Sequence, residues 1–285
     1  MSELGWKENE QSVRQLQFLV KTYEGLTKLS VATKNRLCHL HDIPPKFDSV
    51  MMMLDKMFNA VRGDIRGLLN PIPIWNKWLV NVPGIGESYA SQLLILYYWR
   101  FIPICEECGA DLASGNGNGD DDKESRAFVC PECGTKAKGQ GVLKTRFEEK
   151  DFPNISGWWH YLGMHVVDGK KPKRTKNVRC DWSPKGRTLS FLIGKQFERT
   201  SPNVGHPYRK YYDERKAYRL KTHPDTSQAH RANMAMNETA KLFLSHFWQV
   251  ARSLDGKPLT QPWVIAQGGH SKVIPPFYWD GNGGK

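Results

Sequence analysis

Two short cysteine motifs constrain this chain more than any other feature. They read Cys105-Glu-Glu-Cys108-Gly and Cys130-Pro-Glu-Cys133-Gly, and 21 residues lie between Cys108 and Cys130. Each motif can present two thiolates to one ion from a tight turn, and the glycine that follows gives the backbone the freedom to make that turn. We predict that the four cysteines bind one structural Zn²⁺ ion, because a closed shell of four thiolates leaves no position for a catalytic water.

The alternative for these cysteines is a pair of disulfides. The N-terminal sequence is polar and lacks the apolar stretch of a signal peptide, and no run of 18 apolar residues occurs. We therefore expect a cytoplasmic protein without a membrane partner, with nucleoid association or a viral or mobile-element origin left open. In a reducing compartment, CxxC pairs are more often metal ligands than disulfides.

The charge of the chain is concentrated in one segment. The formal net charge is +12, and residues 169–221 alone hold 16 Lys and Arg against four acidic residues. A local excess of this size favours a polyanionic partner over a surface that is merely solvated. We expect that partner to be nucleic acid, with DNA favoured and RNA left open.

Apolar spacing predicts a largely helical fold, and the hydrophobic content of 39% is enough for a core. Helices are predicted at about 47–69, 87–99, 186–198, 207–221 and 226–253. The aromatic-rich residues 157–167 are expected to form a strand or a buried loop, and Met51, Met52 and Met53 to fill a core. The fold class that follows is mainly α with a small β zinc ribbon, a helix-hairpin-helix unit and a C-terminal helical domain.

Five segments are expected along the chain. They are an N-terminal helical region (1–70), a helix-hairpin-helix unit (71–102), the zinc ribbon (103–140), a basic helical domain (141–255) and an irregular C-terminal tail (256–285). Within the ribbon, the acidic loop 114–122 would repel phosphate, so we expect a structural role for the ribbon or a contact between this loop and a protein partner.

A glycine-rich turn is the first candidate for a nucleic-acid contact. Val82-Pro83-Gly84-Ile85-Gly86 precedes a predicted helix, and Gly84 and Gly86 would allow a tight turn and close approach of the backbone. Unpaired amides at the start of the next helix can bind phosphate without reading sequence. An ordinary interhelical turn is the alternative.

The basic segment supplies the other candidate contacts, since Lys and Arg neutralise backbone phosphates. They are Lys170, Lys171, Lys173, Arg174, Lys176, Arg179, Lys185, Arg187, Arg209, Lys210, Arg215 and Arg219.

The order of these parts resembles the C-terminal region of the DEDD-type insertion-sequence transposases, the bridge-RNA-guided recombinases. The similarity runs from about residue 47 to residue 253. The matching stretches are LVNVPGIGESYASQLL, WWHYLGMHVVDGK, SPKGRTLSFLIGKQF, HPYRKYYDERKAY and AHRANMAMNETAKLFLSHFW. The resemblance implies a basic, transposase-like helical domain that binds DNA.

Two departures from that family bear on catalysis. The family carries an RNase H-like domain with four acidic metal ligands before this region, and the roughly 46 residues here are too few for such a fold. The family also has a nucleophilic serine after the Leu-Gly segment, where this chain reads Val166-Val167-Asp168-Gly169-Lys170. Ser183 is a weak candidate nucleophile, because a serine before proline at a helix start is more simply an N-cap.

Three functions are therefore compatible with the sequence. The leading hypothesis is a non-enzymatic nucleic-acid-binding protein related to these transposases. The alternatives are a recombinase component that acts with a catalytic partner in trans and a zinc-ribbon interaction module, such as a transcription or assembly factor.

Overall fold

A computed structural model describes residues 6, 9–39, 45–112, 130–135, 145–175, 178, 180–260 and 273–280. These residues are mainly helical, with eight α-helices and one small two-stranded antiparallel sheet, as the sequence predicts. The chain divides into two compact units, one formed by residues 1–95 and 189–285 and the other by residues 96–188. The first unit is thus discontinuous in sequence.

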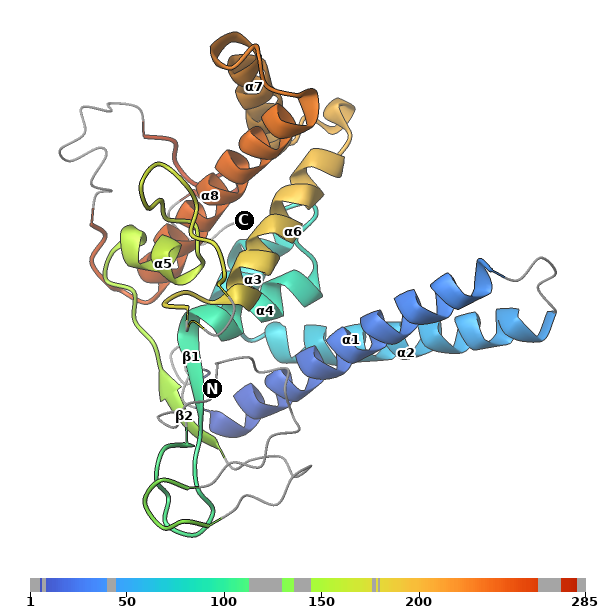
Figure 1. Ribbon diagram of the computed structural model, residues 1–285, viewed down its shortest axis with the longest axis vertical. Helices are drawn as coiled ribbons and strands as arrows, with labels where there is room; N and C mark the ends of the chain where they lie inside the picture. The colour runs from blue at the N-terminus through green and yellow to red at the C-terminus, as the bar shows by residue number, and fades with distance from the viewer. Residues whose placement is uncertain are drawn as a thin grey trace. The chain divides into compact units, whose positions relative to one another are not determined.

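The first unit begins with a pair of long helices, α1 (Glu10–Leu37) and α2 (Pro45–Leu69), which run side by side (Figure 1). Buried residues of α1 recur at three- and four-residue spacing, at Val13, Leu16 and Val20, which makes one apolar stripe. Helix α2 confirms the helix predicted at 47–69. Met52 and Met53 are 59% and 67% exposed, so their expected place in a core is wrong.

The remaining helices of this unit enclose its aromatic core. Trp78 is fully buried and stacks on Phe243 with ring centroids 5.6 Å apart. The elements are α3 (Pro73–Lys77), η1 (Leu79–Asn81), α4 (Glu87–Tyr98), α6 (Pro184–Arg199), η3 (Pro202–Val204), α7 (Pro207–Thr222) and α8 (Gln228–Leu254), with α4 and α6 continuing into the second unit. Helices α4, α6, α7 and α8 confirm the predicted positions within about two residues.

Helices α6 and α8 approach closely at Gly194. A Cβ at this position would lie 2.8 Å from the Met236 Cγ and 3.0 Å from the Met236 carbonyl oxygen. Only glycine allows the helix backbone to come this near without a shift.

Residues 273–280 have no helix or strand, as expected for the tail. Their backbone carbonyls nevertheless accept hydrogen bonds from buried side chains of the core. The Trp78 indole Nε1 donates to the Phe277 carbonyl at 2.7 Å, and the His246 Nε2 lies 3.0 Å from the Ile274 carbonyl. Because a carbonyl can only accept, His246 carries its proton on Nε2, and its Nδ1 accepts from the Tyr208 hydroxyl at 2.8 Å. Burial then lowers the pKa of His246 to about 4.

The second unit is built on the sheet of β1 (Trp99–Pro103) and β2 (Thr145–Glu149), paired antiparallel with Phe101 opposite Phe147. Helix α5 (Ile155–Tyr161) follows, so the strand or buried loop expected at 157–167 is wrong for its first part. The Asn154 side chain caps this helix by accepting from the Gly157 N–H at 2.7 Å. Such a cap starts a helix even where aromatic residues favour a strand.

None of the helices in the described parts of the chain combines the length and the apolar character needed to cross a membrane.

Candidate metal centre and nucleic-acid interface

The four cysteines of the two motifs form one cluster in the second unit. Each motif makes the same pair of backbone hydrogen bonds: Gly109 N to Cys105 O and Gly134 N to Cys130 O, both 3.0 Å, and Cys105 N to Ala110 O and Cys130 N to Thr135 O, both 2.8 Å. The glycines take φ of +73° and +70°, a left-handed conformation that glycine adopts without strain. The tight turn predicted for each cysteine motif is therefore present, and the four cysteines lie in one cluster.

The sulfur positions fit a tetrahedral ion. The Sγ atoms of Cys105 and Cys133 are 3.6 Å apart, and those of Cys108 and Cys130 are 3.5 Å apart. A tetrahedral shell with metal–sulfur bonds of about 2.3 Å separates its ligands by about 3.8 Å, whereas a disulfide requires about 2.05 Å. All four cysteines are free of disulfides and can hold a metal ion together.

The thiols influence one another strongly. A hydrogen bond with the Thr135 side chain, its backbone amide and Cys108 lower the pKa of Cys133 to about 6. The Ala110 amide lowers the pKa of Cys108, but bonds with Cys133 and Cys130 outweigh it and raise that pKa to about 12. The four thiols thus bind protons unequally, and a metal ion would displace the protons that remain.

The first cysteine turn is joined to the sheet. Ile104 and Asp111 form an isolated bridge, and Arg146 of β2 pairs with Asp111 at 3.1 Å and with Glu148 at 2.9 Å. Cys105 and Cys130 are buried together with Leu112. The cysteine cluster thus lies at the end of the β1–β2 sheet. A metal ion bound there would link the two cysteine turns. The predicted acidic loop 114–122 lies outside the described residues.

The glycine-rich turn of the first unit adopts the expected tight conformation. Gly84 has φ +88°, and a Cβ there would lie 3.2 Å from the Gln196 Cβ, whereas Gly86 faces open space. The His206 Nε2 lies 3.0 Å from the Pro83 carbonyl. The turn is therefore packed against its own unit on the Gly84 side and open at Gly86.

A carboxylate stands at the start of the helix that follows the turn. Glu87 is the first residue of α4, is only 4% exposed, and pairs with Arg66 and, at 3.4 Å, with Arg62 of α2. Burial raises the pKa of Glu87, but its own backbone N–H and the two arginines outweigh this and hold the pKa below its ordinary value. A phosphate that approached the backbone amides at the start of α4 would meet the negative charge of Glu87. The sequence pattern alone did not reveal this.

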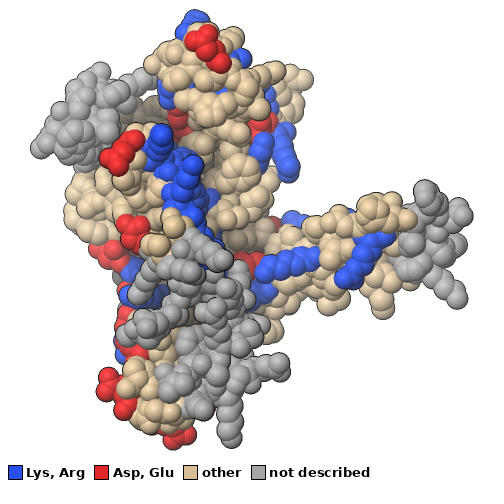
Figure 2. Space-filling model, viewed as in Figure 1, with Lys and Arg blue, Asp and Glu red and all other residues tan. Residues whose placement is uncertain are grey.

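The basic segment of the second unit begins with a tight turn. Asp168 and Gly169 have φ of +49° and +74°, and Val167 and Lys170 form an isolated bridge across them. Lys170, Lys173 and Arg174 are exposed, and Lys171 is partly exposed. Figure 2 shows Lys and Arg gathered on this face over the segment that joins α5 to α6. Lys176 and Arg179 lie outside the described residues.

Arg187 fastens this segment to the start of α6. Its guanidinium donates to the Pro172 carbonyl and lies 4.9 Å from the centre of the Trp182 ring. Lys185, two residues earlier, is partly exposed.

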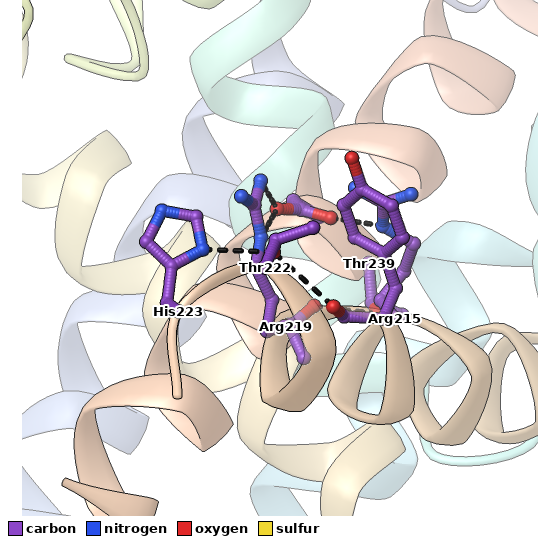
Figure 3. A network of polar contacts seen from close by, with 8 residues as sticks. Arg215, Arg219, Thr222, His223 and Thr239 are labelled. Carbon is purple, nitrogen blue, oxygen red and sulfur yellow. Dashed lines mark hydrogen bonds and ion pairs between the residues drawn. The ribbon is translucent and has the colours of Figure 1, made fainter. Parts of the chain in front are cut away.

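Three of the predicted contacts on α7 are engaged within the first unit. Arg215 and Arg219 both pair with Glu238 of α8, the latter through its Nε at 2.7 Å (Figure 3). Arg209 pairs with Asp213 at 2.8 Å and donates to the Thr200 carbonyl at 2.7 Å. Lys210 is exposed. These arginines therefore join α7 to its neighbours, and their role as nucleic-acid contacts stays a prediction.

Ser183 takes the N-cap position that the Ser-Pro sequence predicts. Its Oγ accepts from the Gly186 N–H at 3.0 Å, its carbonyl accepts from the Arg187 N–H at 3.0 Å, and α6 begins at Pro184.

One polar cluster was missed by the sequence analysis. His160, His165 and Asp181 come together in the second unit, with the His160 Nε2 3.1 Å from the Asp181 Oδ2. The spacing His-x₄-His was the available signal, and the third member is 16 residues further along the chain.

No family model and no curated protein matches this chain.

Proposed function

We propose that this chain is a nucleic-acid-binding protein, with DNA as the favoured ligand, which holds the phosphate backbone without cutting it. The observation that carries the proposal is the exposed basic segment 170–174. The described residues between Met164 and Thr188 include six Lys and Arg and two Asp, and Arg187 fixes one side of the segment through the Pro172 carbonyl. A fixed, cation-rich surface binds phosphates independently of base sequence.

A structural zinc ion at the four cysteines fits this function. The sulfur spacing suits the ion, and four thiolates would close its shell, so the ion would make the two turns a zinc ribbon that stabilises the second unit. Glu106, Glu107 and Glu132 are exposed around the turns and disfavour phosphate there. The metal centre would therefore support the basic surface and leave nucleic-acid contact to residues 170–174.

The resemblance to insertion-sequence transposases agrees with binding without cleavage. Ser183 caps helix α6 through its hydrogen bonds, so its presence is explained by a structural role. This supports a chain that carries no nucleophile of its own. We propose that the chain is related to that family, and this relationship predicts DNA as the ligand.

A salt series with matched variants tests the function. Fluorescence anisotropy with labelled duplex DNA, single-stranded DNA and structured RNA should show affinity that falls steeply with salt, with the strands intact on a denaturing gel. The double variant Lys170→Ala/Lys173→Ala should bind more weakly and lower the salt slope by about 0.9 for each lost phosphate contact on duplex DNA.

The control is Lys28→Ala/Lys56→Ala, which removes the same charge from exposed positions of α1 and α2. This control should leave affinity near that of the original chain. Equal losses in both double variants would refute a localised interface, and salt-independent binding would refute the function.

A further inference from the structure

His160, His165 and Asp181 are brought together by the backbone around the end of α5. Gly163, with φ +63°, turns the chain after the helix, and the Met164 N–H donates to the Trp159 carbonyl at 2.8 Å. The Ser183 N–H donates to the Tyr161 carbonyl at 2.7 Å, which holds the segment containing Asp181 beside the two histidines.

The glycine at the turn is required by packing as well as by its backbone conformation. A Cβ on Gly163 would lie 2.7 Å from the Trp182 Cε3, so the indole ring occupies the space that a side chain would need. Trp182 is buried next to Asp181 in sequence. The position of the carboxylate relative to the turn is thus set by a packed aromatic ring and by the backbone bond of Ser183.

The donor atoms converge, and one ring nitrogen of His165 lacks a hydrogen-bond partner. One nitrogen from each histidine and one Asp181 oxygen lie within 4.8 Å of one another. The two imidazole rings stack with centroids 4.0 Å apart and an angle of 22° between their planes. The His165 Nδ1 is buried and has no hydrogen-bond partner among the described residues, which is costly for a polar atom.

An ion can reach this cluster from solvent. The side chains of His160 and Asp181 are 44% and 70% exposed. Two of the three side chains therefore face water, and the third, His165, is partly buried with its Nδ1 shielded from solvent.

We propose that His160, His165 and Asp181 bind a second divalent transition-metal ion of the Zn²⁺, Co²⁺ or Ni²⁺ class. Two imidazole nitrogens and one carboxylate oxygen are a donor set that such ions favour, and water fills the remaining positions. An imidazole lone pair lies in the plane of its ring, and the two stacked planes are only 22° apart, so one ring must turn out of the stack for both nitrogens to reach one ion. An ion pair between His160 and Asp181 alone leaves the buried His165 nitrogen unsatisfied.

This centre differs chemically from the four-cysteine cluster. Three nitrogen and oxygen donors leave an open shell, whereas four thiolates close theirs. Cobalt distinguishes the two, because thiolate ligands give intense charge-transfer absorption and nitrogen and oxygen ligands give only weak ligand-field bands.

The test is a Co²⁺ titration of the full, untagged chain, combined with metal analysis after dialysis. The original chain should bind two equivalents, one with thiolate bands and one with ligand-field bands alone. His165→Ala and Asp181→Asn should each keep the thiolate bands and lose the second equivalent, or weaken it by more than tenfold. His230→Ala, at an exposed histidine in the first unit, should keep both.

Binding of a single equivalent by the original chain, with thiolate bands only, overturns the proposal. Retention of two equivalents by Asp181→Asn overturns it as well, and this variant changes a side chain that is 70% exposed, where substitutions usually alter stability little. If His165→Ala alone lowers both equivalents, Asp181→Asn decides the question.

Discussion

Replacing Glu87 by Gln tests whether the turn at residues 82–86 contacts phosphate. Glu87 is 5% exposed in its side chain and sits between Arg62 and Arg66, which are 46% and 60% exposed. A hydrogen bond to a charged group contributes about 1.5–3 kcal/mol when shielded, and an exposed pair at most about 1 kcal/mol. Because the arginines are half exposed, we expect Glu87→Gln to lower the free energy of unfolding by about 1–2 kcal/mol.

The same change should strengthen nucleic-acid binding. It removes a negative charge from the start of α4 and frees two arginines, and each added phosphate contact steepens the salt slope by about 0.9 on duplex DNA. Urea unfolding and anisotropy across a salt series measure the two effects. Asp64→Asn, at an exposed residue of α2, is the control for net charge alone.

The pH dependence of stability gives a second readout of Glu87. The folded-state pKa is below its ordinary value, so the stabilisation is present above that ordinary value and is lost as the pH falls through the folded pKa. Glu87→Gln should remove this acid-side loss. A variant that loses stability while its salt slope stays equal to that of Asp64→Asn would refute phosphate contact at the turn, and unchanged stability would refute the ion-pair argument.

The other predictions concern the metal cluster and the core. Cys133→Ser should release one equivalent of Zn²⁺ on metal analysis and lower the melting temperature, whereas Cys38→Ser should do neither. Gly194→Ala should destabilise in urea because overpacking costs about 1–3 kcal/mol against a helix-propensity gain of about 1 kcal/mol, whereas Gly63→Ala, with nothing within 4 Å, should stabilise. His246, with a folded pKa of about 4 against about 6.5 unfolded, should cost about 3 kcal/mol of stability as the pH falls from 6.5 to 4, a loss that His246→Gln removes in urea midpoints.

The parts of the fold that sequence predicted well are those set by local pattern. Helices α2 and α8 follow from apolar spacing, the cysteine cluster from two matching motifs, and the Ser183 cap from a serine before proline. These signals lie within a few residues of the structure that they specify.

The parts that were missed depend on tertiary contacts or on a competing local signal. Helix α5 lies where a strand or buried loop is predicted, because its aromatic residues favour a strand and the prediction did not consider the Asn154 cap. The pairing of Glu87 with Arg66 joins residues 21 positions apart, and that of Arg219 with Glu238 joins residues 19 apart. The His160–Asp181 contact likewise spans 21 residues, and only the folded chain reveals it.

The discontinuous first unit has a consequence for the order in which the chain folds during synthesis. Residues 96–188 are contiguous, so the ribosome delivers all of the second unit before α7 and α8 exist. The first unit can be completed only later, because the carbonyls that accept from His246 and Trp78 belong to residues 274 and 277, respectively. Domains that emerge whole can fold as they leave the ribosome. The second unit should therefore become resistant to proteases on stalled ribosomes while proteases can still cleave helices α1 to α3.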